Sequence, residues 1–106
     1  MVRRIREVVG DDPVYLSLDL DVLGSPYMPG TTLPEPFGVT DLEVRELLCG
    51  LRGLDLIGAD VVELCPHHDP SGHSAILAAW LAFEVLCLLS EARNARAGER
   101  RPTQWA

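Results

Sequence analysis

The sequence predicts an α/β fold in which two parallel strands are joined by a crossover helix. Two apolar runs, residues 14–20 and 55–64, have the composition of strands that helices cover on both faces. Three segments with helical spacing alternate with them, over residues 2–9, 40–53 and 73–92. The predicted order is therefore helix, strand, helix, strand, helix, which is the pattern of a parallel sheet.

The first helix and the first strand are separated by a short turn. In residues 2–9, VRRIREVV, charged and aliphatic side chains follow a helical spacing, and Gly10 is expected to end the helix. The strand over residues 14–20, VYLSLDL, stays apolar on both faces until its aspartates. A long loop with four prolines follows over residues 24–38. The apolar side chains of the strand are expected in the core: Tyr15, Leu16, Leu18 and Leu20.

The second helix has a defined start. Thr40 is followed three residues later by Glu43, which predicts a capping box, and the helix is expected to weaken near Gly50. The second strand, residues 55–64 with the sequence DLIGADVVEL, is nearly continuously apolar and carries Glu63 near its end.

The last predicted helix covers residues 73–92, with Ser71 as a candidate N-cap. Its apolar stretch AILAAWLAFEVLCLL is interrupted by Glu84 and is shorter than the ~20 residues of a membrane span, so a buried helix is predicted. Trp80 and Phe83 are expected in packing contacts, and Glu84 is expected to be solvated or paired with an arginine.

Composition excludes several classes of function. With 106 residues the chain is long enough for one small domain, predicted over residues 1–92, followed by a polar, basic tail over residues 93–106 that is expected to fray. The net charge of −7 argues against binding nucleic acid. Three cysteines without a CxxC motif, and no visible signal peptide, favour reduced, buried thiols in a cytoplasmic protein.

Carboxylates follow both predicted strands at the edge where ligands of parallel sheets bind. Asp19 and Asp21 end the first strand and Glu63 ends the second. Side chains two apart on a strand point to one face, so Asp19 and Asp21 are expected to project together. Adjacent buried carboxylates repel unless a cation lies between them, which predicts a divalent metal. The alternative is that the aspartates cap a loop.

Two motifs resemble the ureohydrolases, the family of arginase and agmatinase. The segment SLDLDVLGSPYMPGTTLPEPFGVT, residues 17–40, is similar to the pattern S-x-D-x-D-x-x-D-P-x-x-x-P-G-T-G-T-P-E-x-x-G-L. The segment LIGADVVELCPHHDPSGHSAILAAWLAFEVL, residues 56–86, resembles G-x-D-x-V-E-x-x-P-x-x-D and the alanine-rich helix after it. Within the family, LPEPFGVT and GADVVELCP look more like agmatinase than arginase.

The resemblance implies a fold, a reaction and three site residues. The fold would be part of a three-layer α-β-α arginase-like domain. The reaction would be manganese-dependent hydrolysis of a small guanidino substrate to urea and an amine. Asp19 matches an aspartate that bridges two manganese ions, and Asp21 matches one that completes the coordination of one metal. Glu63 matches the glutamate that pairs with the substrate guanidinium.

The sequence also departs from the family pattern. Gly24 and Ser25 stand where the family has an aspartate and a proline, and Thr32 and Leu33 replace a glycine and a threonine. The histidine-bearing motifs of the family, GGDHS and DAHxD, are absent. The chain therefore resembles the C-terminal third of a ureohydrolase, which predicts either a homo-oligomer or a missing N-terminal half. The alternative function is a catalytically inactive remnant that acts only as a packing partner.

A third hypothesis concerns the loop CPHHDPSGH. It places Cys65, His67, His68, Asp69 and His73 within nine residues. Cysteine and histidine are the ligands that zinc prefers, so a small zinc module is possible on residue types alone, although the spacing fits no known zinc pattern. For Asp69 and Ser71 the alternative is helix capping, and for His73 an exposed position in the first helical turn.

Overall fold

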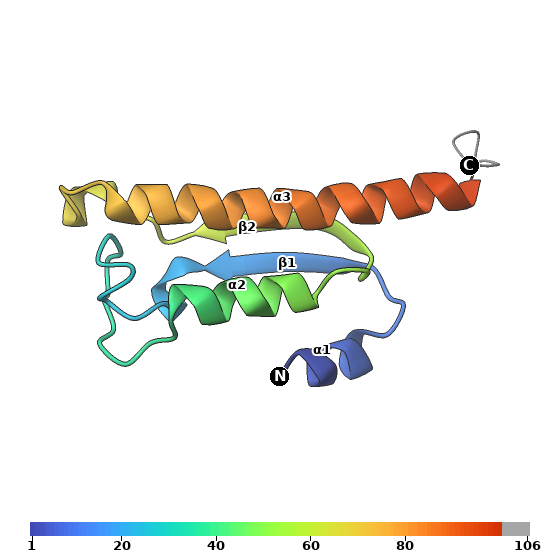
Figure 1. The fold of residues 1–106 in the computed structure, drawn as a ribbon, viewed down its shortest axis with the longest axis horizontal. Coiled ribbons are helices and arrows are strands. Elements are labelled where there is room, and N and C mark those ends of the chain that lie inside the picture. Colours follow the sequence, from blue (N-terminus) through green and yellow to red (C-terminus); the bar gives the residue numbers. More distant parts are fainter. Residues whose placement is uncertain (101–106) are drawn as a thin grey trace.

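The computed structural model describes residues 1–100, apart from the side chains of residues 99 and 100. Its helices and strands are α1 (Val2–Val9), β1 (Val14–Asp19), α2 (Asp41–Gly50), β2 (Leu56–Val62) and α3 (His73–Arg100), as Figure 1 shows. Two 3-10 turns follow the strands, η1 (Leu20–Val22) after β1 and η2 (Pro66–His68) after β2. The predicted α/β class and the order of elements are confirmed.

The two strands pair in parallel, as the sequence predicts. Leu16 lies opposite Ala59, and Leu18 lies opposite Val61. Because β1 and β2 run in the same direction, their carboxyl ends lie at one edge of the sheet. The sequence predicted the second strand over residues 55–64, whereas β2 covers only Leu56–Val62. The next residue, Glu63, has a positive φ of 72°, and this left-handed backbone ends the strand.

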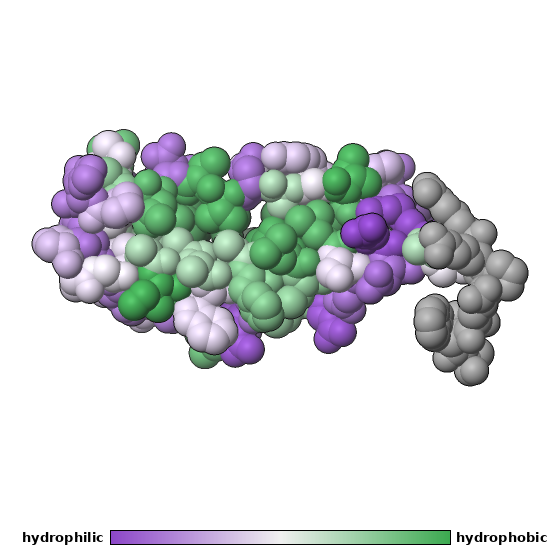
Figure 2. Space-filling view, turned by 90° about the horizontal axis from the view of Figure 1, so that it is seen from above, coloured by the Kyte–Doolittle hydropathy of each residue, from purple (hydrophilic) through white to green (hydrophobic). Residues whose placement is uncertain are grey.

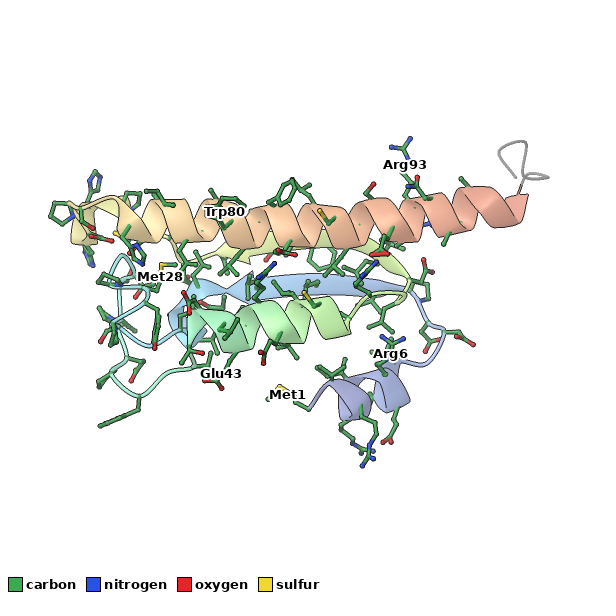
Figure 3. All side chains as sticks on the ribbon, viewed as in Figure 1. Met1, Arg6, Met28, Glu43, Trp80 and Arg93 are labelled. Atoms are coloured by element: carbon green, nitrogen blue, oxygen red, sulfur yellow. The ribbon has the colours of Figure 1, made fainter. Side chains whose placement is uncertain are left out.

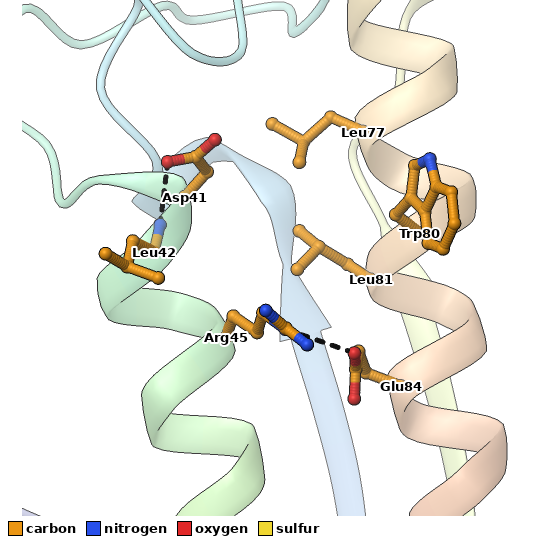
Figure 4. Close-up of a pocket in the computed structure, with 7 residues that line it drawn as sticks. All are labelled: Asp41, Leu42, Arg45, Leu77, Trp80, Leu81 and Glu84. Atoms are coloured by element: carbon orange, nitrogen blue, oxygen red, sulfur yellow. Dashed lines mark hydrogen bonds and ion pairs between the residues drawn. The ribbon is translucent and has the colours of Figure 1, made fainter.

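Helices α2 and α3 pack against one face of the sheet. Leu18 of β1 belongs to the same buried cluster as Val44 and Leu48 of α2 and Leu81 and Val85 of α3. In Figure 4 both helices lie in front of the strands, and Arg45 of α2 reaches Glu84 of α3 with a separation of 3.3 Å between Nε and Oε1. The arginine pairing predicted as one alternative for Glu84 is therefore present. These two helices supply one covering layer for the sheet.

The other face of the sheet is open in the described part of the chain. Tyr15, Ser17 and Asp19 alternate with the half-buried Leu16 and the buried Leu18 and point away from α2 and α3, and all three are exposed. The prediction that Tyr15 belongs to the core is wrong, because 61% of its surface is exposed. The strand composition indicated two covered faces, and residues 1–100 cover only one.

Helix α2 begins with the predicted capping box. The Thr40 hydroxyl accepts a hydrogen bond from the Glu43 backbone N–H at 3.1 Å, and Glu43 Oε1 accepts one from the Thr40 N–H at 3.3 Å. Helix α1 packs against the other end of α2, where Arg6 donates to the carbonyl oxygens of Gly50 and Arg52, both at 3.0 Å (Figure 3). These contacts hold the three helices on the same small core.

Helix α3 is longer than predicted. It continues past Ala92 to Arg100, whereas the sequence predicted a frayed tail from residue 93. Arg52 donates to both carboxylate oxygens of Glu91, at 3.0 Å to each, and Arg96 donates to the Asp55 carboxylate and, at 3.0 Å, to the Leu56 carbonyl. The contacts of Arg96 hold the helix beyond Ala92, the last buried residue among those described. Residues 101–106 of the predicted tail lie outside the described residues.

The outward side of α3 is apolar. Trp80 and Phe83 are 64% and 56% exposed and contact each other edge-on, with ring centroids 6.5 Å apart. They pack against each other and do not belong to the core of the described residues. Figure 2, which looks down onto the molecule from the side of α3, shows hydrophobic side chains along the helix. By length and composition alone, residues 73–98 of α3 could cross a membrane, but core helices of soluble proteins pass the same test.

The three cysteines form no disulfide with one another, and the prediction that they are buried is wrong for Cys49 and Cys87. Cys49 and Cys87 are exposed and Cys65 is half-buried.

Glycine allows one close approach in the loop before α2, because a Cβ on Gly38 would lie 2.4 Å from the Gly24 nitrogen. The buried Met28 anchors this loop to the core (Figure 3).

Candidate functional site

The carboxylates singled out in the sequence come together at the carboxyl edge of the sheet. Asp19 is the last residue of β1 and lies opposite Val62, the last residue of β2. Glu63 follows Val62 directly, and Asp21 lies in the turn η1 just beyond Asp19. The left-handed backbone of Glu63 costs about 1–2 kcal/mol for a residue other than glycine.

The expectation that Asp19 and Asp21 project together from one strand is wrong in one respect. The strand ends at Asp19, so Asp21 belongs to a 3-10 turn and not to the strand. The Asp19 carboxylate Oδ1 accepts a hydrogen bond from the Asp21 backbone N–H at 3.0 Å. Asp19 therefore caps this turn, which was the alternative to metal binding, and the metal-binding role of both residues stays a prediction.

The acidic side chains at this edge affect one another. The pKa of Asp21 is raised, first by its side-chain hydrogen bond with Asp19, and then by burial and by the negative charges of Asp19, Glu63 and Glu35. A raised carboxyl pKa means that the charged form is disfavoured by its surroundings. The edge of the sheet is therefore a place where a cation would relieve repulsion.

The residues present do not complete a metal centre. Within residues 1–100, no group of three or more His, Cys, Asp or Glu side chains is placed to hold a metal ion. Oxygen-rich sites for manganese are close to octahedral, with about six ligands. Two aspartates therefore do not fit a pair of metal ions by themselves.

The loops after the two strands are tied together by a buried hydrogen-bond relay. Ser74, in the first turn of α3, is fully buried. Its hydroxyl donates to Asp69 Oδ2 at 2.6 Å and accepts from the Gly30 N–H at 2.8 Å. Asp69 also accepts from the Ser74 N–H at 2.8 Å and from the Ser71 hydroxyl at 2.6 Å. These donors hold the pKa of Asp69 well below its usual range, with Ser71 as the largest cause.

Two further contacts extend the relay. The Cys65 N–H donates to the Gly30 carbonyl at 2.6 Å, and His68 Nδ1 lies 2.8 Å from the Thr31 carbonyl oxygen. The predicted capping role of Asp69 is confirmed by its bond to the Ser74 N–H. Ser74 and Gly30 were not expected from the sequence. A polar residue on the buried side of an apolar helix was the available signal for Ser74.

The zinc hypothesis finds no support in the geometry. His67 and His73 are exposed, as predicted for His73, and one ring nitrogen of His68 is engaged with Thr31. Cys65 is half-buried. The loop CPHHDPSGH lies entirely within the described residues, and they contain no metal-binding group of three.

Gly24 is tightly packed against the loop that contains Gly38. It is buried, and a Cβ there would lie 3.3 Å from the Gly38 carbonyl oxygen, so the neighbouring loop would have to shift slightly to admit a side chain. The chain thus lacks a carboxylate at a position where the resembling pattern has one.

The comparisons with known proteins agree on one family. Residues 1–88 match the sequence profile of the arginase family. Guanidinopropionase from Pseudomonas aeruginosa is 52% identical over 86 residues, which are 81% of this chain and 27% of that protein. Mitochondrial agmatinase from Gallus gallus is 44% identical over 89 residues, which are 84% of this chain and 26% of that protein.

Solved structures agree with these sequence matches. A hypothetical agmatinase from Burkholderia thailandensis matches 89% of this chain and 30% of its own, with a TM-score of 0.81 and 41% identity. Arginase from Bacillus subtilis matches with a TM-score of 0.73 and 27% identity, over 83% of this chain and 31% of its own. The chain thus spans about a quarter of the length of the curated relatives it matches. The profile match over 88 residues and these relatives show that the chain belongs to the arginase family.

Proposed function

We propose that this chain supplies one part of the active site of a manganese-dependent ureohydrolase of the agmatinase type. The observation that carries the proposal is the meeting of Asp19, Asp21 and Glu63 at the carboxyl edge of a parallel sheet, in a chain of the arginase family. The raised pKa of Asp21 supports it, because the acidic side chains are held together at a cost that a cation would offset.

The three carboxylates have different roles in the proposal. Asp19 and Asp21 contribute oxygen ligands to manganese, together with ligands that this chain does not contain. A manganese pair, when bound, lowers the pKa of a coordinated water toward neutrality. Glu63 pairs with the planar guanidinium group of the substrate and orients it, since a carboxylate matches the fork of N–H donors.

The proposed substrate is a small guanidino compound, from which hydrolysis releases urea and an amine. The names of the relatives, guanidinopropionase and agmatinase among them, refer to guanidino compounds with either an acidic or a basic far end. The proposal therefore commits to the guanidino group, which Glu63 recognises, and leaves the far end of the substrate open. A cytoplasmic location and an assembly larger than one chain belong to the same proposal.

The experiment is urea release by the assembled protein, this chain together with the remaining part of an arginase-family domain. Substrates are agmatine, 3-guanidinopropionate and 4-guanidinobutyrate, each with manganese and after treatment with a chelator. Asp19→Ala is expected to abolish both manganese binding and urea release. Glu63→Gln is expected to keep manganese binding, measured by calorimetry, and to raise KM strongly because it weakens the ion pair with guanidinium.

Asp11→Asn serves as the control, because Asp11 is an exposed carboxylate in the turn before β1. Equal urea release by the Asp19→Ala variant and the unaltered chain would contradict the proposed roles.

The second candidate function is a non-catalytic member of the family that serves as a packing partner. The specific observation in its favour is Gly24, where the resembling pattern has an aspartate. If the assembled protein releases no urea, and Gly24→Asp gives it activity, the non-catalytic function is correct for the natural chain. Activity of the unaltered assembly would exclude it.

A further inference from the structure

Glu63 is held in a backbone conformation that it does not prefer. Its φ of 72° lies in the left-handed region, and it is the one residue other than glycine with a positive φ in the described part of the chain. Outliers of this kind persist only where the surrounding structure fixes the backbone, and they gather at functional sites. The conformation of Glu63 therefore depends on what holds the chain just before and just after it.

The chain before Glu63 is attached to the neighbouring strand through Asp60. Both oxygens of the Asp60 carboxylate accept hydrogen bonds from β1, Oδ1 from the Ser17 hydroxyl at 2.6 Å and Oδ2 from the Tyr15 hydroxyl at 3.0 Å. The bond to Asp60 raises the pKa of the Tyr15 hydroxyl, which therefore stays protonated and able to donate at neutral pH. Two bonds to two residues of β1 oppose both sliding and rotation of the end of β2.

Glycine at position 58 allows the longer of these two attachments. Gly58 lies opposite Tyr15 in the sheet. A Cβ on Gly58 would lie 2.9 Å from Cδ2 and 3.0 Å from Cε2 of the Tyr15 ring. The ring thus passes directly over the glycine, and its hydroxyl reaches Asp60 two residues further along β2.

The attachment lies where the regular pairing of the two strands begins. The register shifts between Val14 and Tyr15, and from Tyr15 onward it is unbroken to the pair of Asp19 and Val62. A slip of one residue would exchange the two faces of a strand. The register fixed at Tyr15 therefore decides that Glu63 is the next residue after the one opposite Asp19.

The chain after Glu63 is attached through its backbone. The Cys65 N–H donates to the Gly30 carbonyl oxygen at 2.6 Å, and Gly30 belongs to the loop that follows β1. Glu63 is therefore bracketed by two attachments to the β1 segment, one three residues before it and one two residues after it. The first is made by side chains, so substitution can remove it.

We propose that Asp60 is a positioning residue for Glu63, which it acts on by tying the end of β2 to Ser17 and Tyr15. The inference rests on the proposed function in one respect, namely that Glu63 pairs with the guanidinium group of the substrate. That pairing needs the carboxylate to be aligned with the planar fork of N–H donors. Release of Asp60 would misplace the Glu63 carboxylate without removing its charge.

The first experiment measures the Glu63 backbone by NMR in the 106-residue chain. A left-handed backbone brings the amide proton close to the Hα of the same residue, which gives a strong nuclear Overhauser contact. Asp60→Ala is expected to weaken this contact, and Tyr15→Phe, which removes one of the two bonds, is expected to weaken it less. Asp60→Asn is expected to keep it, because the amide accepts from Ser17 and donates to the Tyr15 hydroxyl oxygen.

Asp12→Ala is the matched control, since Asp12 is an exposed aspartate in the turn before β1. The amide signal of the buried Leu48 is recorded in every variant and is expected to stay unchanged. An undiminished Glu63 contact in both Asp60→Ala and Tyr15→Phe would overturn the inference. Equal weakening by Asp12→Ala would also overturn it, because the effect would then not come from the bonds of Asp60.

The second experiment is a double-mutant cycle on urea release by the assembled protein. Asp60→Ala is expected to raise KM about tenfold while manganese affinity stays unchanged, because small misplacements of a binding group are costly. Asp60→Asn is expected to restore KM. In the background of Glu63→Gln, Asp60→Ala is expected to add little, since the two changes affect one contact. Full additivity would show that Asp60 does not act through Glu63.

The failure of this inference differs from the failure of the proposed function. If the unaltered assembly releases no urea while the Glu63 contact responds to Asp60 as expected, the function alone is refuted. If urea is released and the Glu63 contact ignores both Asp60→Ala and Tyr15→Phe, the positioning role is refuted and the function stands.

Discussion

Ser74 shows how one side chain can join two loops at an acidic site. Its hydroxyl is used twice, as a donor to Asp69 and as an acceptor for the Gly30 backbone N–H. Gly30 has to be glycine for this approach, since a Cβ there would lie 2.6 Å from the Ser74 Cβ. The relay therefore fixes the loop that follows the Asp19–Asp21 turn to the start of α3.

Ser74→Ala is expected to destabilise the chain by about 1–3 kcal/mol, because the buried Gly30 N–H loses its acceptor and Asp69 loses a donor. Urea denaturation at pH 7 measures the change. Ser90→Ala, at an exposed position of the same helix, is the control and is expected to change little. A stability loss equal to that of the control would show that the relay contributes nothing.

Asp21→Asn is expected to raise the melting temperature at pH 7. The folded-state pKa of Asp21 lies above its ordinary value of 3.8, so its charged form destabilises the folded chain as pH rises through that pKa. Below pH 3.8 the aspartate is protonated in both states, and the advantage of asparagine should vanish there. Melting curves between pH 3 and pH 7 test this, with Asp11→Asn as the control. An advantage of equal size at both ends of the range would mean that carboxylate repulsion is not its cause.

At the scale of the elements, α3 is held by groups far from it in sequence. The Arg52–Glu91 pair joins it to the turn after α2, and Arg96 joins it to the start of β2 through Asp55 and the Leu56 carbonyl. The capping box of α2 involves only residues 40–43 and could be predicted from the sequence, whereas these contacts span about 40 residues. That difference explains why the start of α2 was predicted correctly and the end of α3 was not.

Arg96→Ala is expected to fray the last turns of α3 and to cost about 1 kcal/mol, since the Asp55 pair is about one-third exposed and one backbone carbonyl loses its donor. Amide hydrogen exchange in residues 93–98 is the measurement. Arg93→Ala, which changes an exposed arginine on the same helix, is the control. Unchanged protection in the Arg96 variant would mean that helix propensity alone maintains these turns.

At the scale of the whole molecule, repulsion between negative charges destabilises the folded chain. The net charge is −7, and the carboxylates at the sheet edge repel one another. The outward side of α3 adds exposed apolar surface, including Trp80 and Phe83, so the isolated chain is expected to be marginally stable. A partner, a cation or added salt should each relieve part of this cost.

Raising the NaCl concentration from 0.01 M to 1 M is expected to increase the melting temperature of the isolated chain, because the screening length falls from about 30 Å to about 3 Å. The variant Asp19→Asn/Asp21→Asn should depend less on salt, since two charges of the cluster are removed. Differential scanning fluorimetry at pH 7 compares the two proteins. A melting temperature that falls with salt, or equal slopes for both proteins, would rule out the cluster as the main source of the repulsion.

The sequence by itself determined the class of the fold and the place of the acidic residues. Apolar runs, the capping box at Thr40 and Glu43, and the glycine at position 10 are local signals, and the elements they predict are present. The spacing of the two motifs placed Asp19 and Glu63 after neighbouring parallel strands, and the register confirms that placement. Capping hydrogen bonds and apolar runs are encoded within a few residues, so one sequence suffices to recover them.

Only the tertiary structure decided which apolar side chains are buried and how the loops are held. Tyr15 and Trp80 have the composition of core residues, yet both are exposed, because burial depends on what another element places against them. Asp21 lies in a 3-10 turn after the strand, Ser74 links two loops through its hydroxyl, and α3 extends to Arg100. The link through Ser74 and the end of α3 depend on contacts between residues distant in the chain, and such contacts are fixed by packing in three dimensions.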